Sequence, residues 1–129
     1  MGWHGNAILV RKSATVIAHD VMHIPCLEPR GAIMAHCEWE GKELAIFGMH
    51  LDLSGLWRRR QAAAIIKLAQ EKQREVPVVL SFHSRSPIAT LDRIMHSDDI
   101  QSSASGVHDS PAARKASDHL PVWAQIAVD

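Results

Sequence analysis

The stretch Ser117-Asp118-His119-Leu120-Pro121-Val122 places a carboxylate and an imidazole side by side, directly before an apolar run. A carboxylate can hold a divalent cation, and an imidazole beside it can donate or accept a proton. The Asp-His dipeptide alone is a weak signal, because it also occurs as a loop acid ahead of a strand. Its meaning therefore depends on the rest of the chain.

Composition limits the classes of protein that the chain can belong to. Its 129 residues are the length of one domain, and we expect a single domain over residues 1–129. The numbers of acidic and basic residues are equal, 14 each, so the overall charge favours neither nucleic acid nor a membrane surface. The aromatic residues are four Trp and two Phe, without basic-aromatic interleaving. Nucleic acid is therefore expected only as a substrate.

The cysteines and the N-terminal sequence are the features that indicate the cellular compartment of the protein. Cys26 and Cys37 do not have the spacing of a zinc site, and a disulfide between them has no support from the pattern. The sequence shows neither a secretion signal nor an apolar run near eighteen residues. We therefore expect a reduced, cytoplasmic protein without a membrane span.

Apolar periodicity and turn residues predict a mixed α/β domain. A polar loop is expected over 81–87 and a loop-rich segment over 97–116. The expected elements are a buried strand at 5–10, an alternating segment at 15–22 broken at His19-Asp20, a β-hairpin of 31–39 and 43–50 about a turn at 40–42, a helix at 56–74, a buried strand at 76–80, a strand at 91–95 and a closing strand at 121–128.

The helix over 56–74 is predicted by apolar residues at helical spacing, namely Ala62, Ile65, Ile66 and Ala69. Ser54 or Asp52 is its expected N-cap. Three arginines, at 58–60, occupy the first turn, where they oppose the helix dipole. A solvated helix face is the favoured interpretation of these arginines, and attraction of phosphate is the alternative.

Two further segments carry polar groups where function is expected. His50-Leu51-Asp52 ends the second strand of the hairpin, and strand ends are where α/β domains place their sites. Leu91-Asp92-Arg93-Ile94 carries an acid within an apolar run, and an unpaired buried carboxylate is costly. His119 is the obvious partner for Asp92.

These segments, in this order, resemble the endonuclease/exonuclease/phosphatase superfamily of deoxyribonuclease-I-like, metal-dependent phosphoesterases. The resemblance runs over nearly the whole chain and implies a reduced form of the four-layer α-β-β-α sandwich, with mixed β-sheets flanked by helix. The segments that are similar to bacterial members are Gly5-Asn6-Ala7-Ile8-Leu9, Glu28-Pro29-Arg30-Gly31-Ala32, His50-Leu51-Asp52-Leu53, Arg58-Arg59-Arg60-Gln61 and Ala116-Ser117-Asp118-His119-Leu120-Pro121.

The resemblance also implies roles for single residues. His119 would act on the scissile phosphate as acid or base, and Asp92 would orient its imidazole. His50 would contact phosphate oxygens, and Asp118 would lie beside the metal. Arg30 and Asp52 would have supporting roles in substrate binding.

The chain departs from the family pattern in two places. Full-length members begin earlier, with strands that carry an asparagine and the metal-binding glutamate, so the chain resembles an N-terminally truncated member. After Ser81 it also lacks the Gly-Asp-x-Asn motif, which indicates an internal deletion. His83, at that junction, could supply a ligand for a softer metal. We expect a second copy, as in a homodimer, to cover the sheet surface that these losses expose.

The resemblance implies a metal-dependent hydrolase of phosphoester bonds, with Mg²⁺ or Mn²⁺ as the metal and Zn²⁺ as an alternative. The competing interpretation is a catalytically impaired remnant that acts as a binding or structural module. A hydrolase of the metallo-β-lactamase type ranks low, because His50-Leu51-Asp52 supplies only a fragment of the His-x-His-x-Asp-His cluster that it needs.

Overall fold

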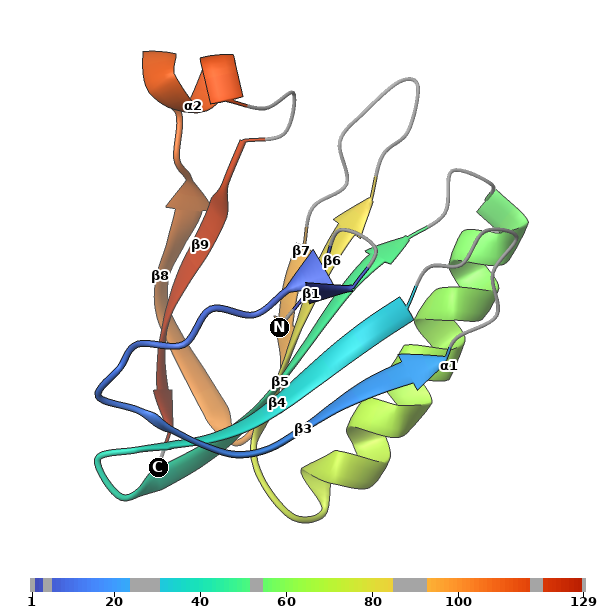
Figure 1. The fold of residues 1–129 in the computed structure, drawn as a ribbon, viewed down its shortest axis with the longest axis vertical. Coiled ribbons are helices and arrows are strands. Elements are labelled where there is room, and N and C mark those ends of the chain that lie inside the picture. The colour runs from blue at the N-terminus through green and yellow to red at the C-terminus, as the bar shows by residue number, and fades with distance from the viewer. Residues whose placement is uncertain are drawn as a thin grey trace.

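The computed structural model describes residues 2–3, 6–23, 31–51, 55–84, 93–116 and 120–128. A five-stranded sheet is at the centre, with the long helix α1 on one side and a two-stranded sheet on the other (Figure 1). The elements, in chain order, are β1 (Gly2–Trp3), β2 (Asn6–Ala7), β3 (Thr15–His23), β4 (Gly31–Trp39), β5 (Lys42–Leu51), α1 (Gly55–Gln73), β6 (Val78–Ser84), β7 (Arg93–His96), β8 (Ile100–Val107), α2 (Pro111–Ala116) and β9 (Val122–Val128).

The central sheet has the strand order β3-β4-β5-β6-β7 and is mixed. Strands β5 and β6 are parallel, with α1 as the crossover between them, and the other neighbouring pairs are antiparallel. Strands β8 and β9 form the antiparallel second sheet, and β9 contacts β5 and β7 of the central sheet. The predicted α/β class with mixed sheets and a flanking helix is confirmed.

The predicted hairpin is confirmed as β4 and β5. Trp39 pairs with Lys42, so the turn consists of Glu40 and Gly41. Their φ angles are 52° and 77°. Positive φ at both positions is the geometry of a type I′ turn, whose twist matches that of the flanking strands.

Helix α1 confirms the helix predicted over 56–74 and packs on the central sheet. Its fully buried stripe consists of Gln61, Ile65 and Ala69, whereas Ala62 and Ile66 are only partly buried. The buried stripe is therefore rotated from the predicted one and begins with a polar side chain. The core against this stripe consists of Ala32, Ala45, Phe47, Met49, Val76, Val78 and Leu80.

Strand β6 shows why the predicted loop over 81–87 is wrong at its start. The predicted buried strand is present, since Val76, Val78, Val79 and Leu80 are all buried. The ladder with β5 then continues through Ser81 to Ser84. Backbone pairing with a central strand thus holds polar residues in strand geometry, which periodicity alone does not indicate.

Three other predictions need correction. Residues 5–10 do not form one buried strand, because β2 covers only Asn6–Ala7 and Leu9 is 92% exposed. Strand β3 runs through His19-Asp20 without a break, because the ladder with β4 continues there. The segment 97–116 is not loop-rich, since it contains β8 and α2. The closing strand is confirmed as β9, and the strand predicted at 91–95 is described from Arg93 onward as β7.

Candidate functional site

Several strand ends meet at one end of the central sheet. Strands β5 and β6 are parallel and both end there, whereas β4 and β7 are antiparallel to them and begin there. Strand β9 also begins at this end, which is the upper end in Figure 1. Loops that join such ends can bring distant parts of the sequence together.

The predicted site residues are close in sequence to these ends. His50 is the next-to-last residue of β5. Arg30, Asp52, Asp92, Asp118 and His119 lie outside the described residues, so their predicted roles remain predictions. Their described chain neighbours are Gly31 at the start of β4, Leu51 at the end of β5, Arg93 at the start of β7 and Leu120 shortly before β9. These described neighbours therefore lie at one end of the fold.

His50 lies on the face of the sheet that is turned away from α1. In β5 the core residues Ala45, Phe47 and Met49 alternate with it and face the helix, so period-two alternation assigns His50 to the other face. Its side chain is half-buried. In the parallel ladder between β5 and β6, the register partner of His50 is His83.

The pairing of His50 with His83 could not be obtained from the sequence pattern. The segment from Ser81 was expected to be a loop, and a loop has no register with β5. The signal that could have extended the strand is Phe82, an apolar aromatic residue that continues the run Val78-Val79-Leu80.

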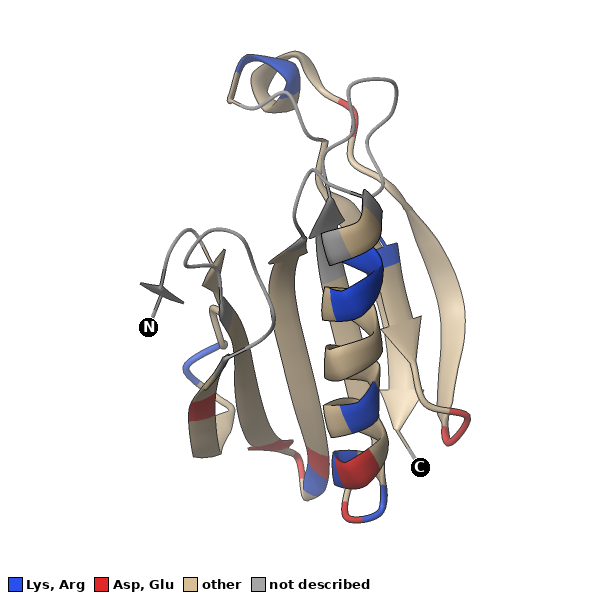
Figure 2. Ribbon diagram, turned by 90° about the vertical axis from the view of Figure 1, so that its right-hand side faces the viewer, with Lys and Arg blue, Asp and Glu red and all other residues tan. Residues whose placement is uncertain are grey.

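The arginines at 58–60 lie in the first turns of α1, toward the end of the sheet where β5 and β6 end (Figure 2). Arg58 is half-buried, and Arg59 and Arg60 are exposed. Because α1 covers the face opposite to that of His50, these arginines belong to another layer of the structure. The exposure of Arg59 and Arg60 agrees with the favoured interpretation of the arginines as part of a mainly solvated helix face.

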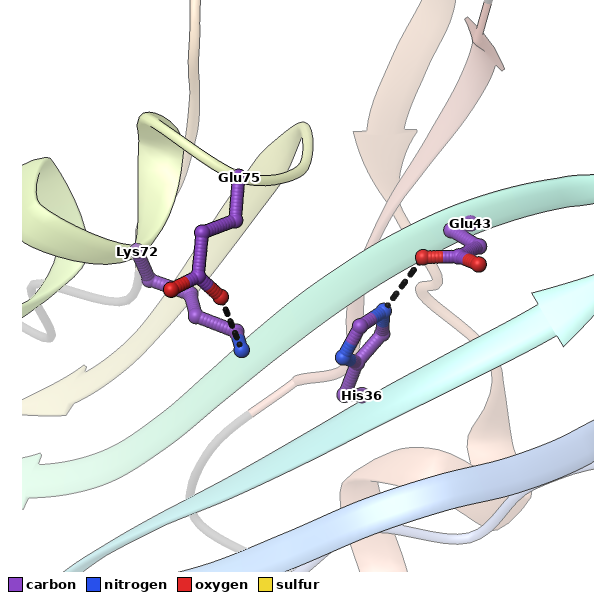
Figure 3. A network of polar contacts seen from close by, with 4 residues as sticks. All are labelled: His36, Glu43, Lys72 and Glu75. Carbon is purple, nitrogen blue, oxygen red and sulfur yellow. Dashed lines mark hydrogen bonds and ion pairs between the residues drawn. The ribbon is translucent and has the colours of Figure 1, made fainter.

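The polar pairs in Figure 3 lie at the opposite end of the sheet, near the end of α1. His36 Nε2 is 2.9 Å from Glu43 Oε2, and Lys72 Nζ donates a hydrogen bond of 2.9 Å to Glu75 Oε2. The Lys72 ammonium lowers the pKa of the Glu75 carboxyl through this hydrogen bond and its charge. These residues are about the length of the sheet away from His50, and we assign them no catalytic role.

A cavity of about 610 Å³ also lies away from the strand ends. It is lined by Leu9, Cys37, Trp39, Ile46 and Ile126, among others. Ile46 precedes His50 by four residues, which is about 13 Å along a strand. Cys37 is buried and free, and burial raises the pKa of its thiol by desolvation.

Metal binding has no direct support from the described side chains. Among the residues that the structure describes, no three His, Cys, Asp or Glu side chains gather as a metal-binding group. The predicted ligand Asp118 lies outside those residues. Within the same described residues, no helix has the length and apolar character needed to cross a membrane.

Comparison with known proteins gives structural relatives but no sequence relatives. No protein-family model and no curated protein sequence matches the chain. An endonuclease/exonuclease/phosphatase from Bacteroides vulgatus is similar, with a TM-score of 0.77 at 16% identity over 92% of this chain and 68% of that one. A humanized D. rerio TDP2 gives a TM-score of 0.75 at 13% identity over 90% and 66%. The mannosyl-6-phosphatase Bt3783 of Bacteroides thetaiotaomicron gives 0.67 at 14% identity over 89% and 67%.

These similarities cover nine-tenths of the present chain but only about two thirds of each compared structure. At identities of 13–16%, these similarities show a shared fold and do not show a shared activity. The mixed central sheet, the crossover helix and the second sheet agree with part of the α-β-β-α sandwich. The chain therefore has the fold of the endonuclease/exonuclease/phosphatase superfamily, in a reduced form.

Proposed function

We propose that the chain is a metal-dependent hydrolase of phosphoester bonds, with its site at the end of the sheet where β5 and β6 end. The proposal rests on the observation that several strands begin or end at this end of the sheet. The segments that contain Arg30, Asp52, Asp92 and His119 each adjoin a strand end there, and His50 is part of one. The fold agrees with this function, since one compared structure is named a mannosyl-6-phosphatase.

The proposed chemistry depends on an imidazole and a carboxylate. His119 would transfer a proton at the scissile phosphate, a contribution of about 10²–10⁴ in rate. Asp92 would accept a hydrogen bond from the same ring and fix its orientation. His50 would donate a hydrogen bond to a phosphate oxygen, and Arg30 and Asp52 would help to hold the substrate.

A divalent metal would supply charge neutralisation at the phosphoryl oxygens. Asp118 is the proposed ligand, and Mg²⁺ or Mn²⁺ suits a carboxylate ligand, with Zn²⁺ as the alternative. The substrate is a phosphomonoester or phosphodiester. Because the chain has no net charge, a nucleic acid would be bound by local contacts and not by a general positive field.

We also propose that two copies associate. The surface that a second copy would cover is on the sheet, where the exposed apolar side chains include Val16 at 45%, Ile17 at 47% and Trp39 at 50% exposure. Covering such surface is favourable by about 25 cal/mol per Å². Sedimentation at micromolar concentration should give a dimer, and a monomer at that concentration would contradict this part of the proposal.

The test of the activity is hydrolysis of a nitrophenyl phosphodiester and a nitrophenyl phosphomonoester by metal-stripped protein, with Mg²⁺, Mn²⁺ or Zn²⁺ restored in turn. We expect turnover of at least one ester only when a metal is present. Protein that is folded by circular dichroism yet inactive with every metal would refute the proposal and favour a binding or structural module.

A further inference from the structure

The cavity of about 610 Å³ lies between the central sheet and β9. The central sheet lines it with Cys37 of β4 and with Leu44 and Ile46 of β5, and the second sheet lines it with Ile126–Val128. Period-two alternation places Leu44 and Ile46 on the face of β5 that is turned away from α1. Both side chains are only partly buried. Apolar side chains between the two layers of the fold therefore remain partly uncovered.

The walls of this cavity are held by contacts within the protein. Lys42 Nζ, at the start of β5, donates a hydrogen bond to the backbone carbonyl of Val128 at the end of β9, where the two strands lie close together at the lower end of Figure 1. Arg11 and Ala14 line a third wall, and the Arg11 carbonyl accepts a hydrogen bond of 2.9 Å from the backbone N–H of Ala14. The cavity is therefore formed without a ligand, as most small-molecule sites are.

The size and lining of the cavity suit a small molecule with an apolar chain. Small-molecule sites usually have volumes of about 300–1,000 Å³ and a mainly apolar lining. Two of the lining side chains, Leu9 and Trp39, are 92% and 50% exposed. The apolar lining thus continues to the mouth of the cavity.

The charges at the cavity favour an anionic head group. Glu43 Oε2 is 2.9 Å from His36 Nε2, and both side chains belong to the face of the sheet that carries α1 (Figure 3). The charged residues left on the cavity side are Arg11, Lys42 and Glu40, two cations and one anion. Among the residues that the structure describes, none gives the Arg11 guanidinium a hydrogen bond or an ion pair. A guanidinium can bind a carboxylate with two parallel hydrogen bonds.

We propose that this cavity binds one free alkyl carboxylate, with the chain among Leu44, Ile46 and Ile126 and the carboxylate paired with Arg11. The site is separate from the proposed hydrolytic site, because Ile46 is about 13 Å along β5 from His50. The inference therefore goes beyond the proposed function and does not depend on it. A second copy of the chain that covers Trp39 is the competing occupant.

The experiment measures binding of hexanoate, octanoate and 1-octanol to the full chain by isothermal titration calorimetry. We expect one octanoate per chain, with an affinity up to about fifteenfold higher than that of hexanoate, because two further CH₂ groups leave water. Octanoate that does not bind at millimolar concentration, or that binds no more tightly than hexanoate, would overturn the proposal.

The head group is tested by Arg11→Gln, which removes the cation at the mouth. We expect this variant to bind octanoate about two- to fivefold more weakly, as for loss of an exposed ion pair, and 1-octanol as the parent chain does. Lys12→Gln is the matched control, because it removes the same charge at an exposed position that does not line the cavity. An equal loss of octanoate affinity in both variants would indicate general electrostatic attraction and overturn the assigned site.

The cavity itself is tested by Ile46→Trp, which fills it and should abolish binding of octanoate and 1-octanol. Val107→Trp is the control and should change neither, because Val107 is 56% exposed at the end of β8. Parent-like octanoate affinity in folded Ile46→Trp would overturn the proposal, and loss of a dimer in the same variant would assign the cavity to a second copy. If Ile46→Trp fails to fold, Arg11→Gln still tests the site, because Arg11 is exposed.

Discussion

The packing of α1 on the central sheet can be tested at Ile65. This side chain is fully buried, in one cluster with Ala45, Phe47 and Val78 of β5 and β6. Ile65→Ala removes three carbon groups at about 0.8 kcal/mol each, or about 2.4 kcal/mol of transfer free energy. The cavity left behind adds to this loss, and such replacements cost about 2–5 kcal/mol. We expect the free energy of unfolding to fall by about 3–4 kcal/mol.

Ile66→Ala is the matched control, because it removes the same atoms one position along the helix, where the side chain is only partly buried. We expect it to cost about half as much or less, since part of the Ile66 surface stays in water. The assay is urea denaturation followed by far-ultraviolet circular dichroism, with midpoints compared at equal m-values. An equal or larger loss for Ile66→Ala would refute the assigned orientation of α1.

Three further predictions concern single local features. Glu40 has a φ of 52°, so Glu40→Asn should raise the free energy of unfolding in urea by some tenths of a kcal/mol, because asparagine suits a type I′ turn better; a loss would contradict the turn assignment. In a Cys26→Ser background, Cys37 should react with an aromatic disulfide reagent far more slowly in native than in unfolded protein, since burial shields the thiol and raises its pKa; equal rates would contradict its burial. The hydrogen bond from Arg114 lowers the pKa of Asp109 below its ordinary 3.8, so Asp109→Asn should lower the melting temperature above pH 3.8. The difference in melting temperature between the parent chain and this variant should vanish as the pH falls through the lowered pKa, and a difference that persists in strong acid would count against the pair.

The hairpin and α1 could be predicted because their signals are local. Period-two alternation, a Glu-Gly turn and helical spacing each act within a few residues of the chain. The helix orientation was harder, since Gln61 in the buried stripe is polar. Its burial depends on the sheet against which α1 packs, which the helix sequence alone does not contain.

Strand β8 was missed because the sequence Gln101-Ser102-Ser103-Ala104-Ser105-Gly106 has little strand propensity. Pairing with β9 holds it in place, and a methyl group added at Gly106 would lie 3.1 Å from the ring of Trp123. The aromatic ring of one strand therefore covers the glycine of the other. Such a contact between partners far apart in sequence is not visible in either segment alone.

Helix α2 did have a local signal. Ser110 Oγ accepts a hydrogen bond of 3.1 Å from the backbone N–H of Ala113, and Pro111 occupies the first helical position. A serine N-cap followed by proline is a recognised helix start. The short length of the helix, six residues, left too little periodicity to confirm it from the sequence.

The order of the motifs along the chain resembles that of a known superfamily, and the structure confirms the fold that this resemblance predicts. The motifs also directed attention to segments whose described neighbours meet at one end of the sheet. Motif order could not give the pairing of His50 with His83, because register follows from backbone hydrogen bonds between strands. The metal preference and the substrate also depend on which side chains lie close together in space, and motif order does not give this.

The most direct test of the central claim is to compare His119→Ala with His108→Ala in metal-dependent hydrolysis of a nitrophenyl phosphodiester. Because His119 is the proposed proton-transfer group, its removal should lower kcat by about 10²–10⁴ while the folded content stays unchanged. His108→Ala, in an exposed position between β8 and α2, should keep the parent rate. Equal rates for the two variants would contradict the claim that the end of the sheet where β5 and β6 end is a hydrolytic site built on His119.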